Sequence, residues 1–257
     1  MIYGRKHGSG LAGLLAALIF VVMPAQAQDK VLLAEMWMAE VKPGMHADFE
    51  KKFKDHMRER EKLEDPRAWR VYTPVLGEQL NQYMIRYCCF EWKDADSYEK
   101  WGMEKRPDKH WSKHVDKYAQ RYGHNLERID LKNTHWPKGV EANFVGVSQY
   151  FVKMGQWEAM KEDMATISTA AKENNWPYHW SWQFPVGGTP QMKLAIPFKN
   201  YADMAPPEQK FSEIMVKHLG SEEKVKAFWQ RWSSHFETVE YNIYRYRKDL
   251  SMQEKSE

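Results

Sequence analysis

Two kinds of apolar pattern follow one another along the chain, in an order that occurs twice. Alternation of apolar and polar residues predicts strands over residues 31–41, 69–76, 82–92 and 126–131, and again over 144–153, 179–186, 192–199 and 239–246. Apolar residues spaced by three and four predict helices over 45–63, 97–104 and 108–122, and again over 157–173, 208–219 and 222–236. Each half therefore reads strand, helix, strand, strand, helix, strand, with its second helical region interrupted.

Short stretches of sequence support a tandem duplication of this unit. WRVYTPVLG at 69–77 aligns with WSWQFPVGG at 180–188, and VKPG at 41–44 aligns with VKMG at 152–155, both at an offset of 111 residues. A shorter turn then changes the offset to 106, which places CCFEWKD at 88–94 on LAIPFKN at 194–200. We therefore expect a first repeat at 28–132, a linker at 133–142, a second repeat at 143–250 and a polar tail at 251–257.

A strand–helix–strand–strand–helix–strand unit is the ferredoxin-like plan, an antiparallel sheet with helices on one face. The other face needs a cover, which a second copy in the same chain can supply. In element order and duplication the chain resembles the dimeric α+β barrel superfamily, fused in tandem. That group includes antibiotic-biosynthesis monooxygenases, EthD-like and NIPSNAP-like domains, and the chlorite dismutase-like haem proteins. The resemblance implies an α+β fold in which two ferredoxin-like repeats pack as a single-chain barrel, and it carries over no functional residue.

The N-terminus predicts export. Arg5 and Lys6 precede an apolar run at 11–23, and AQA follows at 25–27, which together are typical of a signal peptide over residues 1–27. We therefore expect a periplasmic or secreted protein without a membrane span after cleavage. Loss of the two basic residues leaves 36 basic (38 − 2) against 35 acidic residues, so the mature chain lacks the positive excess with which proteins bind nucleic acid.

The two cysteines are adjacent, at Cys88 and Cys89. Neighbouring residues of a strand point to opposite faces, so we expect these thiols not to bond each other. The chain is also rich in aromatic residues, with 12 Trp, 13 Tyr and 11 Phe. Such residues are typical of cores and interfaces and, less often, of a pocket for a flat ligand.

The two repeats differ at three positions where one is apolar and the other is basic or titratable. In this alignment Ile167, Ala171 and Met192 of the second repeat correspond to His56, Arg60 and Arg86 of the first. Three such groups facing one helix–sheet interior need a polar pocket or charged partners. In the pocket interpretation His56 acts as a base, hydrogen-bond donor or ligand, while Arg60 and Arg86 hold an anionic group. In the alternative they lie at the rim of the interface and pair with acids such as Glu35 or Glu91.

His218 is a second candidate, because it lies beside Ile214 and Met215 on the apolar side of its predicted helix. A neutral imidazole there is either a buried core residue with a backbone partner or an axial ligand of haem, as the chlorite dismutase-like resemblance implies. The HWSKH stretch spaces His110 and His114 like two helical metal ligands. Both lie off the apolar stripe and no third ligand is evident, so we expect no metal there.

These observations leave three hypotheses for function. In the first, the protein binds a small aromatic or anionic ligand in the first repeat without a cofactor, and the resemblance implies cofactor-independent oxygenation or proton-transfer isomerisation with His56, Arg60 and Arg86. In the second it binds haem through His218 or His56. In the third it is a non-catalytic module whose aromatic surface binds a protein partner or forms a homo-oligomer. The sequence contains no P-loop, Rossmann glycine motif, nucleophile elbow or C-x-x-C-H stretch, so nucleotide-driven, hydrolase and covalent-haem functions are not expected.

Overall fold

The computed structural model describes residues 31–253, so the predicted signal peptide lies outside the described residues. The elements of the first half are β1 (Leu32–Val41), α1 (His46–Lys62), β2 (Arg70–Leu76), β3 (Gln82–Phe90), α2 (Trp92–Lys105), α3 (Pro107–His114), η1 (Asp116–Tyr118) and β4 (Ala119–Ile129). Those of the second half are β5 (Phe144–Val152), α4 (Trp157–Glu173), β6 (Ser181–Val186), β7 (Gln191–Phe198), η2 (Ala202–Met204), α5 (Phe211–Leu219), α6 (Glu222–Ser234) and β8 (Phe236–Tyr246). The predicted α+β class is confirmed, and we call the two halves repeat 1 and repeat 2.

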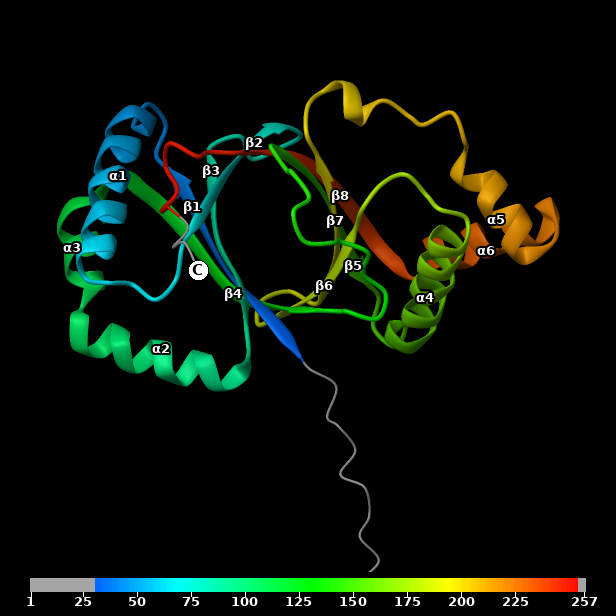
Figure 1. Ribbon diagram of the computed structural model, residues 1–257, viewed down its shortest axis with the longest axis horizontal. Coiled ribbons are helices and arrows are strands. Elements are labelled where there is room, and N and C mark those ends of the chain that lie inside the picture. Colours follow the sequence, from blue (N-terminus) through cyan, green and yellow to red (C-terminus); the bar gives the residue numbers. More distant parts are fainter. Residues whose placement is uncertain (1–30, 254–257) are drawn as a thin grey trace, which may run out of the picture.

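All eight strands form one closed barrel in the order β1-β3-β2-β8-β5-β7-β6-β4, with every neighbouring pair antiparallel. Two ladders join the repeats: Tyr72 of β2 lies opposite Tyr246 of β8, and Leu126 of β4 lies opposite Val186 of β6. Each repeat thus pairs the sheet edges of the other, which leaves no open strand edge in the barrel. The helices lie outside the barrel as two groups on opposite sides (Figure 1).

Each helix group covers an apolar core on the outer face of its sheet. In repeat 1, Phe49 and Phe53 of α1 are fully buried and pack in one cluster with Trp69. In repeat 2, Met164 of α4 is buried in a cluster with Trp180. The Trp-led stretches of the two repeats are therefore strands whose tryptophans face the helices, and burial of each such side chain stabilises the fold by roughly 1.5–3 kcal/mol.

Strand β4 begins earlier than the sequence predicts. Helix α3 ends at His114, and from Ala119 the chain pairs with β1, where Ala119 lies opposite Val41. The helix predicted to residue 122 is wrong at its C-terminal end, because pairing with a strand far away in the sequence provides backbone hydrogen bonds that local spacing does not reveal. Tyr122 still contacts the helix, since the Nε1 of Trp111 donates to its hydroxyl at 3.1 Å.

The third strands of the two repeats, β3 and β7, are not aligned as the sequence comparison predicts. Met38 pairs with Met84 in repeat 1, and Gln149, 111 positions after Met38, pairs with Lys193 in repeat 2. The offset between these strands is therefore 109 residues (193 − 84) and not 106. The difference is an odd number, and an odd slip moves every side chain of a strand to the opposite face.

Cys88 and Cys89 form a disulfide, so the prediction that they do not bond each other is wrong. The peptide bond between them is cis and their Cα atoms are 3.0 Å apart. The prediction assumed that neighbouring side chains of a strand point to opposite faces, whereas Cys88 and Cys89 both line the interior of the barrel.

The C-terminal end of the chain packs on repeat 1. Arg247, directly after β8, donates from Nη1 to Oε1 of Glu50 on α1 at 2.8 Å, and the amide of Met252 donates to the carbonyl of Trp69 at 2.9 Å. Leu250 and Met252 are buried in the repeat-1 core, so the predicted polar tail from residue 251 is wrong for Met252. Within residues 31–253, no helix is both long and apolar enough to cross a membrane.

The turns that follow β2 and β6 provide a test of this packing. Gly77 and Gly188 both have positive φ, +106° and +78°, but only at Gly77 would a Cβ collide with the side chain of Asn242, whose Oδ1 accepts a hydrogen bond from the amide of Glu78 at 2.8 Å. We expect Gly188→Ala to lower the free energy of unfolding by about 1–2 kcal/mol through backbone strain alone. Gly77→Ala should lower it by a further 1–3 kcal/mol, roughly, because of the clash. Urea unfolding of both variants measures the difference, and equal losses would contradict this account.

Candidate functional site

A cavity of about 290 Å³ lies between the helices of repeat 1 and the outer face of its sheet. We call it the helix-side cavity. Its lining includes Glu35, Trp37, His56, Met57, Arg60, Trp69, Tyr98, Trp111 and Tyr122. His56 and Arg60 therefore lie together at a cavity below α1, in the place where the sequence comparison predicts a pocket, while their chemical roles stay predictions.

His56 is almost completely buried, with 2% of its surface exposed. Its Nδ1 lies 3.3 Å from Nδ1 of His110 on α3, and its Nε2 lies 3.5 Å from Nη1 of Arg60, one helical turn further along α1. Burial, followed by the positive charge of Arg60 and the proximity of His110, lowers the pKa of His56 to about 3. The imidazole is therefore neutral at neutral pH, available for hydrogen bonding but weak as a base.

Arg60 is held by groups of repeat 1 and does not present a free guanidinium to the cavity. Its Nε donates to Oδ2 of Asp65 at 2.6 Å, and its Nη2 donates to the hydroxyl of Tyr98. Asp65 is fully buried and accepts three further hydrogen bonds, from the amide of Arg67 at 2.9 Å, from Nε1 of Trp69 at 3.2 Å and from the hydroxyl of Tyr98 at 3.3 Å. The predicted use of Arg60 to hold an anionic ligand is therefore not supported, because a buried carboxylate already neutralises it.

Glu35 on β1 is the acidic group of this site. Its Oε1 accepts from Nε1 of Trp37 at 2.8 Å and lies 3.0 Å from Nε2 of His124, while its Oε2 pairs with Nη1 of Arg67. Burial alone would raise the pKa of Glu35, but the hydrogen bond from His124 and the charge of Arg67 outweigh it and lower the pKa below 4.5. The sequence indicated Glu35 only as a pairing partner, although an acid on the same side of a predicted strand as the apolar Leu33 and Trp37 is a signal that could have found it.

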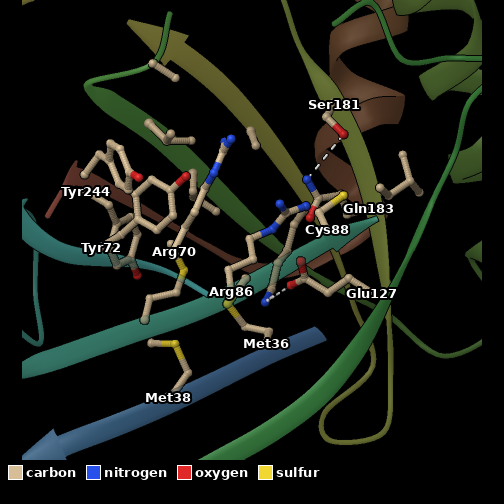
Figure 2. Close-up of a pocket in the computed structure, with 18 of the residues that line it drawn as sticks. Met36, Met38, Arg70, Tyr72, Arg86, Cys88, Glu127, Ser181, Gln183 and Tyr244 are labelled. Atoms are coloured by element: carbon tan, nitrogen blue, oxygen red, sulfur yellow. Dashed lines mark hydrogen bonds and ion pairs between the residues drawn. The ribbon is translucent and has the colours of Figure 1, made fainter. Parts of the chain in front are cut away.

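Arg86 does not share this cavity. It lies on the inner face of β3 and lines a second cavity of about 1230 Å³ inside the barrel (Figure 2). The prediction that Arg86 faces the helices together with His56 and Arg60 is wrong, because the odd error in strand offset reversed the faces of β3. The structure thus brings together two of the three basic residues singled out in the sequence and separates the third by the thickness of the sheet.

Two histidines, His218 and His56, are the candidates for an axial ligand of haem. His218 on α5 points its Nδ1 at Oε2 of Glu173, 3.1 Å away, and it lines neither the helix-side cavity nor the barrel cavity. Beside it, Ile214 and Met215 are fully buried in the packed core of repeat 2. His56 has both ring nitrogens engaged, one of them by the guanidinium of Arg60, whose positive charge opposes binding of a metal cation there. These residues do not fit haem.

His110 and His114, the pair with the spacing of helical metal ligands, lie beside His56. His110 contacts His56, and its ring centroid lies 4.5 Å from that of His114. Within the described part of the chain, no group of three His, Cys, Asp or Glu side chains is placed to hold a metal ion.

Because His56 is buried and neutral in the folded protein, we expect the stability of the fold to depend on pH. Its pKa is about 3 in the folded protein and 6.5 in an unfolded chain, so the unfolded state binds more protons between these values. His56 should therefore favour the folded state fully above pH 6.5 and lose that contribution as pH falls, at about 1.4 kcal/mol per pH unit. The free energy of unfolding, measured with urea, should fall between pH 6.5 and pH 5 by about 2 kcal/mol less in His56→Gln than in the wild type. Equal losses in the variant and the wild type would contradict this account.

Comparison with known proteins supports the fold. No family model matches the sequence, and no curated protein sequence matches it. The structure is similar to that of a candidate monooxygenase from Fusobacterium nucleatum, with 11% identity, a TM-score of 0.53 and coverage of 88% of this chain and 96% of the other. A candidate monooxygenase from Lactobacillus acidophilus has 8% identity, a TM-score of 0.51 and coverage of 84% and 94%. A chlorite dismutase variant from Candidatus Nitrospira defluvii has 8% identity, a TM-score of 0.50 and coverage of 86% and 93%. At these identities the similarity is one of fold, and the chain has the dimeric α+β barrel fold with both halves in one polypeptide.

Proposed function

We propose that repeat 1 binds a small, flat, uncharged aromatic ligand in the helix-side cavity. The observation that carries this proposal is the composition of the cavity wall, where five aromatic residues surround a space whose charged groups are each paired with a neighbouring residue of opposite charge. The five are Trp37, Trp69, Tyr98, Trp111 and Tyr122. Aromatic rings favour planar ligands, through stacked or edge-to-face contacts worth about 0.5–1.5 kcal/mol each beyond the buried area.

The paired charges favour an uncharged ligand. Arg60 is neutralised by Asp65, Glu35 is neutralised by Arg67, and His56 is neutral. An anion placed here would have to compete with Asp65 for Arg60, and it would lose its hydration without gaining a new cation. The hydroxyl of Ser112 at the wall is suited instead to a hydroxyl or ring nitrogen on the ligand.

The volume of about 290 Å³ limits the size of the ligand. Cavities for drug-sized molecules measure roughly 300–1,000 Å³, so this one suits a compound of one or two fused rings. Trp37 is 38% exposed and stacks on His124 with ring centroids 3.8 Å apart, so an aromatic pair lies where the cavity meets solvent.

Binding is supported better than catalysis. Cofactor-independent oxygenation and proton-transfer isomerisation both need a group that accepts a proton near neutral pH. The pKa of His56 is about 3 and that of Glu35 lies below 4.5, so neither is tuned for that task in the ligand-free protein. An enzymatic function of this cavity would require the bound ligand to raise one of these two pKa values.

Titration with 2-naphthol tests the site. We expect saturable quenching of tryptophan fluorescence at one equivalent, and Trp37→Ala should weaken binding about 5- to 10-fold, because one stacking wall of the cavity is removed. Trp92→Ala is the matched control, since Trp92 is 49% exposed and is not part of the cavity wall. Equal effects of the two substitutions, or no binding by the wild type, would refute the proposal.

The same protein titrated with hemin separates this function from the haem alternative. We expect no Soret shift that saturates at one equivalent, because neither His218 nor His56 presents a suitable nitrogen to a cavity. A saturating shift that is lost in His218→Ala would replace the proposal with haem binding.

A further inference from the structure

The interior of the barrel has a chemistry unlike that of the helix-side cavity. Its lining of strand residues from both repeats encloses about 1230 Å³ and carries charged and polar groups beside apolar ones (Figure 2). At one end the lining includes Pro137, Lys138 and Gly139 of the segment between the repeats, which are exposed to solvent. This end gives a small molecule access to the interior.

Two arginines face each other across neighbouring strands of this interior. Arg70 of β2 lies directly opposite Arg86 of β3 in the antiparallel ladder, and both side chains line the cavity. Directly opposed residues have Cβ atoms roughly 4.5–5.5 Å apart, so two like charges at such positions repel each other. Within residues 31–253, no carboxylate or hydrogen-bond acceptor contacts the half-buried guanidinium of Arg86. A ligand anion is the group that would relieve this repulsion.

The acids that line the cavity are largely engaged by other cations. Glu127 is fully buried and accepts from Nζ of Lys193 at 2.6 Å, while Glu40 pairs with Arg121 at 3.1 Å. Lys193 and Arg121 neutralise these two carboxylates, which therefore do not compensate the charge of Arg86. The interior around the opposed arginines is therefore electropositive.

Three residues that line the cavity carry a buried oxygen atom without a hydrogen-bond partner. Oε2 of Glu127, Oδ1 of Asn125 and Oε1 of Gln191 are buried without any hydrogen-bond partner, and all three residues line the cavity. Buried polar atoms normally have a partner, so three in one cavity indicate that a ligand group or water bonds them. A carboxylate oxygen accepts only, which means that the ligand group at Glu127 must be a donor such as a hydroxyl.

An apolar surface lies on the side of the two arginines that is away from Glu127 (Figure 2). Met36, Met84 and Val147 belong to one buried cluster together with the rings of Tyr72 and Tyr244. Figure 2 shows Tyr72 and Tyr244 beside the side chain of Arg70, with Met36 on the β1 side of the cavity. Burial, with smaller contributions from nearby acids, raises the pKa of Tyr244 to about 12, so its hydroxyl remains a neutral hydrogen-bond donor.

We propose that the barrel interior is a second binding site, for a small organic carboxylate that carries a hydroxyl group. Its carboxylate is held by Arg86, its apolar body packs on Met36, which lies directly opposite Arg86 on β1, and its hydroxyl donates to Oε2 of Glu127. This site and the helix-side cavity lie on opposite faces of the repeat-1 sheet, so each can be tested without the other.

Isothermal titration calorimetry with 4-hydroxybenzoate as the probe tests this site. We expect one equivalent to bind the wild-type protein, and benzoate, which lacks the hydroxyl that donates to Glu127, to bind at least tenfold more weakly. Arg86→Met should weaken 4-hydroxybenzoate binding at least tenfold, and Arg86→Lys should weaken it less, because lysine keeps the charge without the bidentate geometry. Arg128→Met is the matched control, since Arg128 is exposed on β4 and does not line the cavity, and it should bind like the wild type.

The thermal unfolding midpoint gives a second readout that does not depend on one variant folding well. The wild type should be stabilised more by 4-hydroxybenzoate than by benzoate, and Trp37→Ala should respond like the wild type. Several outcomes overturn the proposal: equal binding by a folded Arg86→Met protein, equal binding of 4-hydroxybenzoate and benzoate, or wild-type binding of inorganic phosphate but not of 4-hydroxybenzoate. A wild type that binds none of these probes also overturns it.

Discussion

Closure of the eight-stranded barrel is the constraint on which the other features depend. Each repeat alone would form a four-stranded antiparallel sheet with two open edges, whose backbone N–H and C=O groups would lack partners. The β2–β8 and β4–β6 ladders satisfy all of these edges at once. Once the barrel is closed, every strand has an inner and an outer face, and the position of a residue in the alternation decides which face it joins.

This alternation separates two kinds of chemistry across one sheet. On the outer face, Asp65 and Glu35 neutralise Arg60 and Arg67, which leaves a cavity that is uncharged and aromatic. On the inner face, the charge of Arg86 has no such compensation. Buried charges are tolerated on the outer face because each is paired and hydrogen-bonded, since an unpaired buried ion would destabilise the fold by several kcal/mol, roughly.

The two repeats use the same fold but pack it differently beneath their helices. Repeat 2 also buries an ionic group below its first helix, where Oδ2 of Asp163 lies 2.9 Å from Nε2 of His235 and Oδ1 of Asp163 accepts from Arg231 at 2.7 Å. There, however, Trp182 and Met192 are almost wholly buried in a continuous apolar cluster. The helix-side cavity of repeat 1 is therefore a consequence of its particular side chains and not of the fold.

The type and order of the elements and the polar residues below α1 could be predicted from local sequence, because periodicity is local and the two repeats can be compared position by position. That comparison identified His56 and Arg60 correctly as neighbours on the inner side of α1. The folded arrangement was needed to learn that Arg86 faces the barrel interior, that Asp65 holds Arg60, and that β4 begins at Ala119. The reason is that strand register and ion pairing depend on partners far away in the chain, and one odd step in register reverses a whole strand.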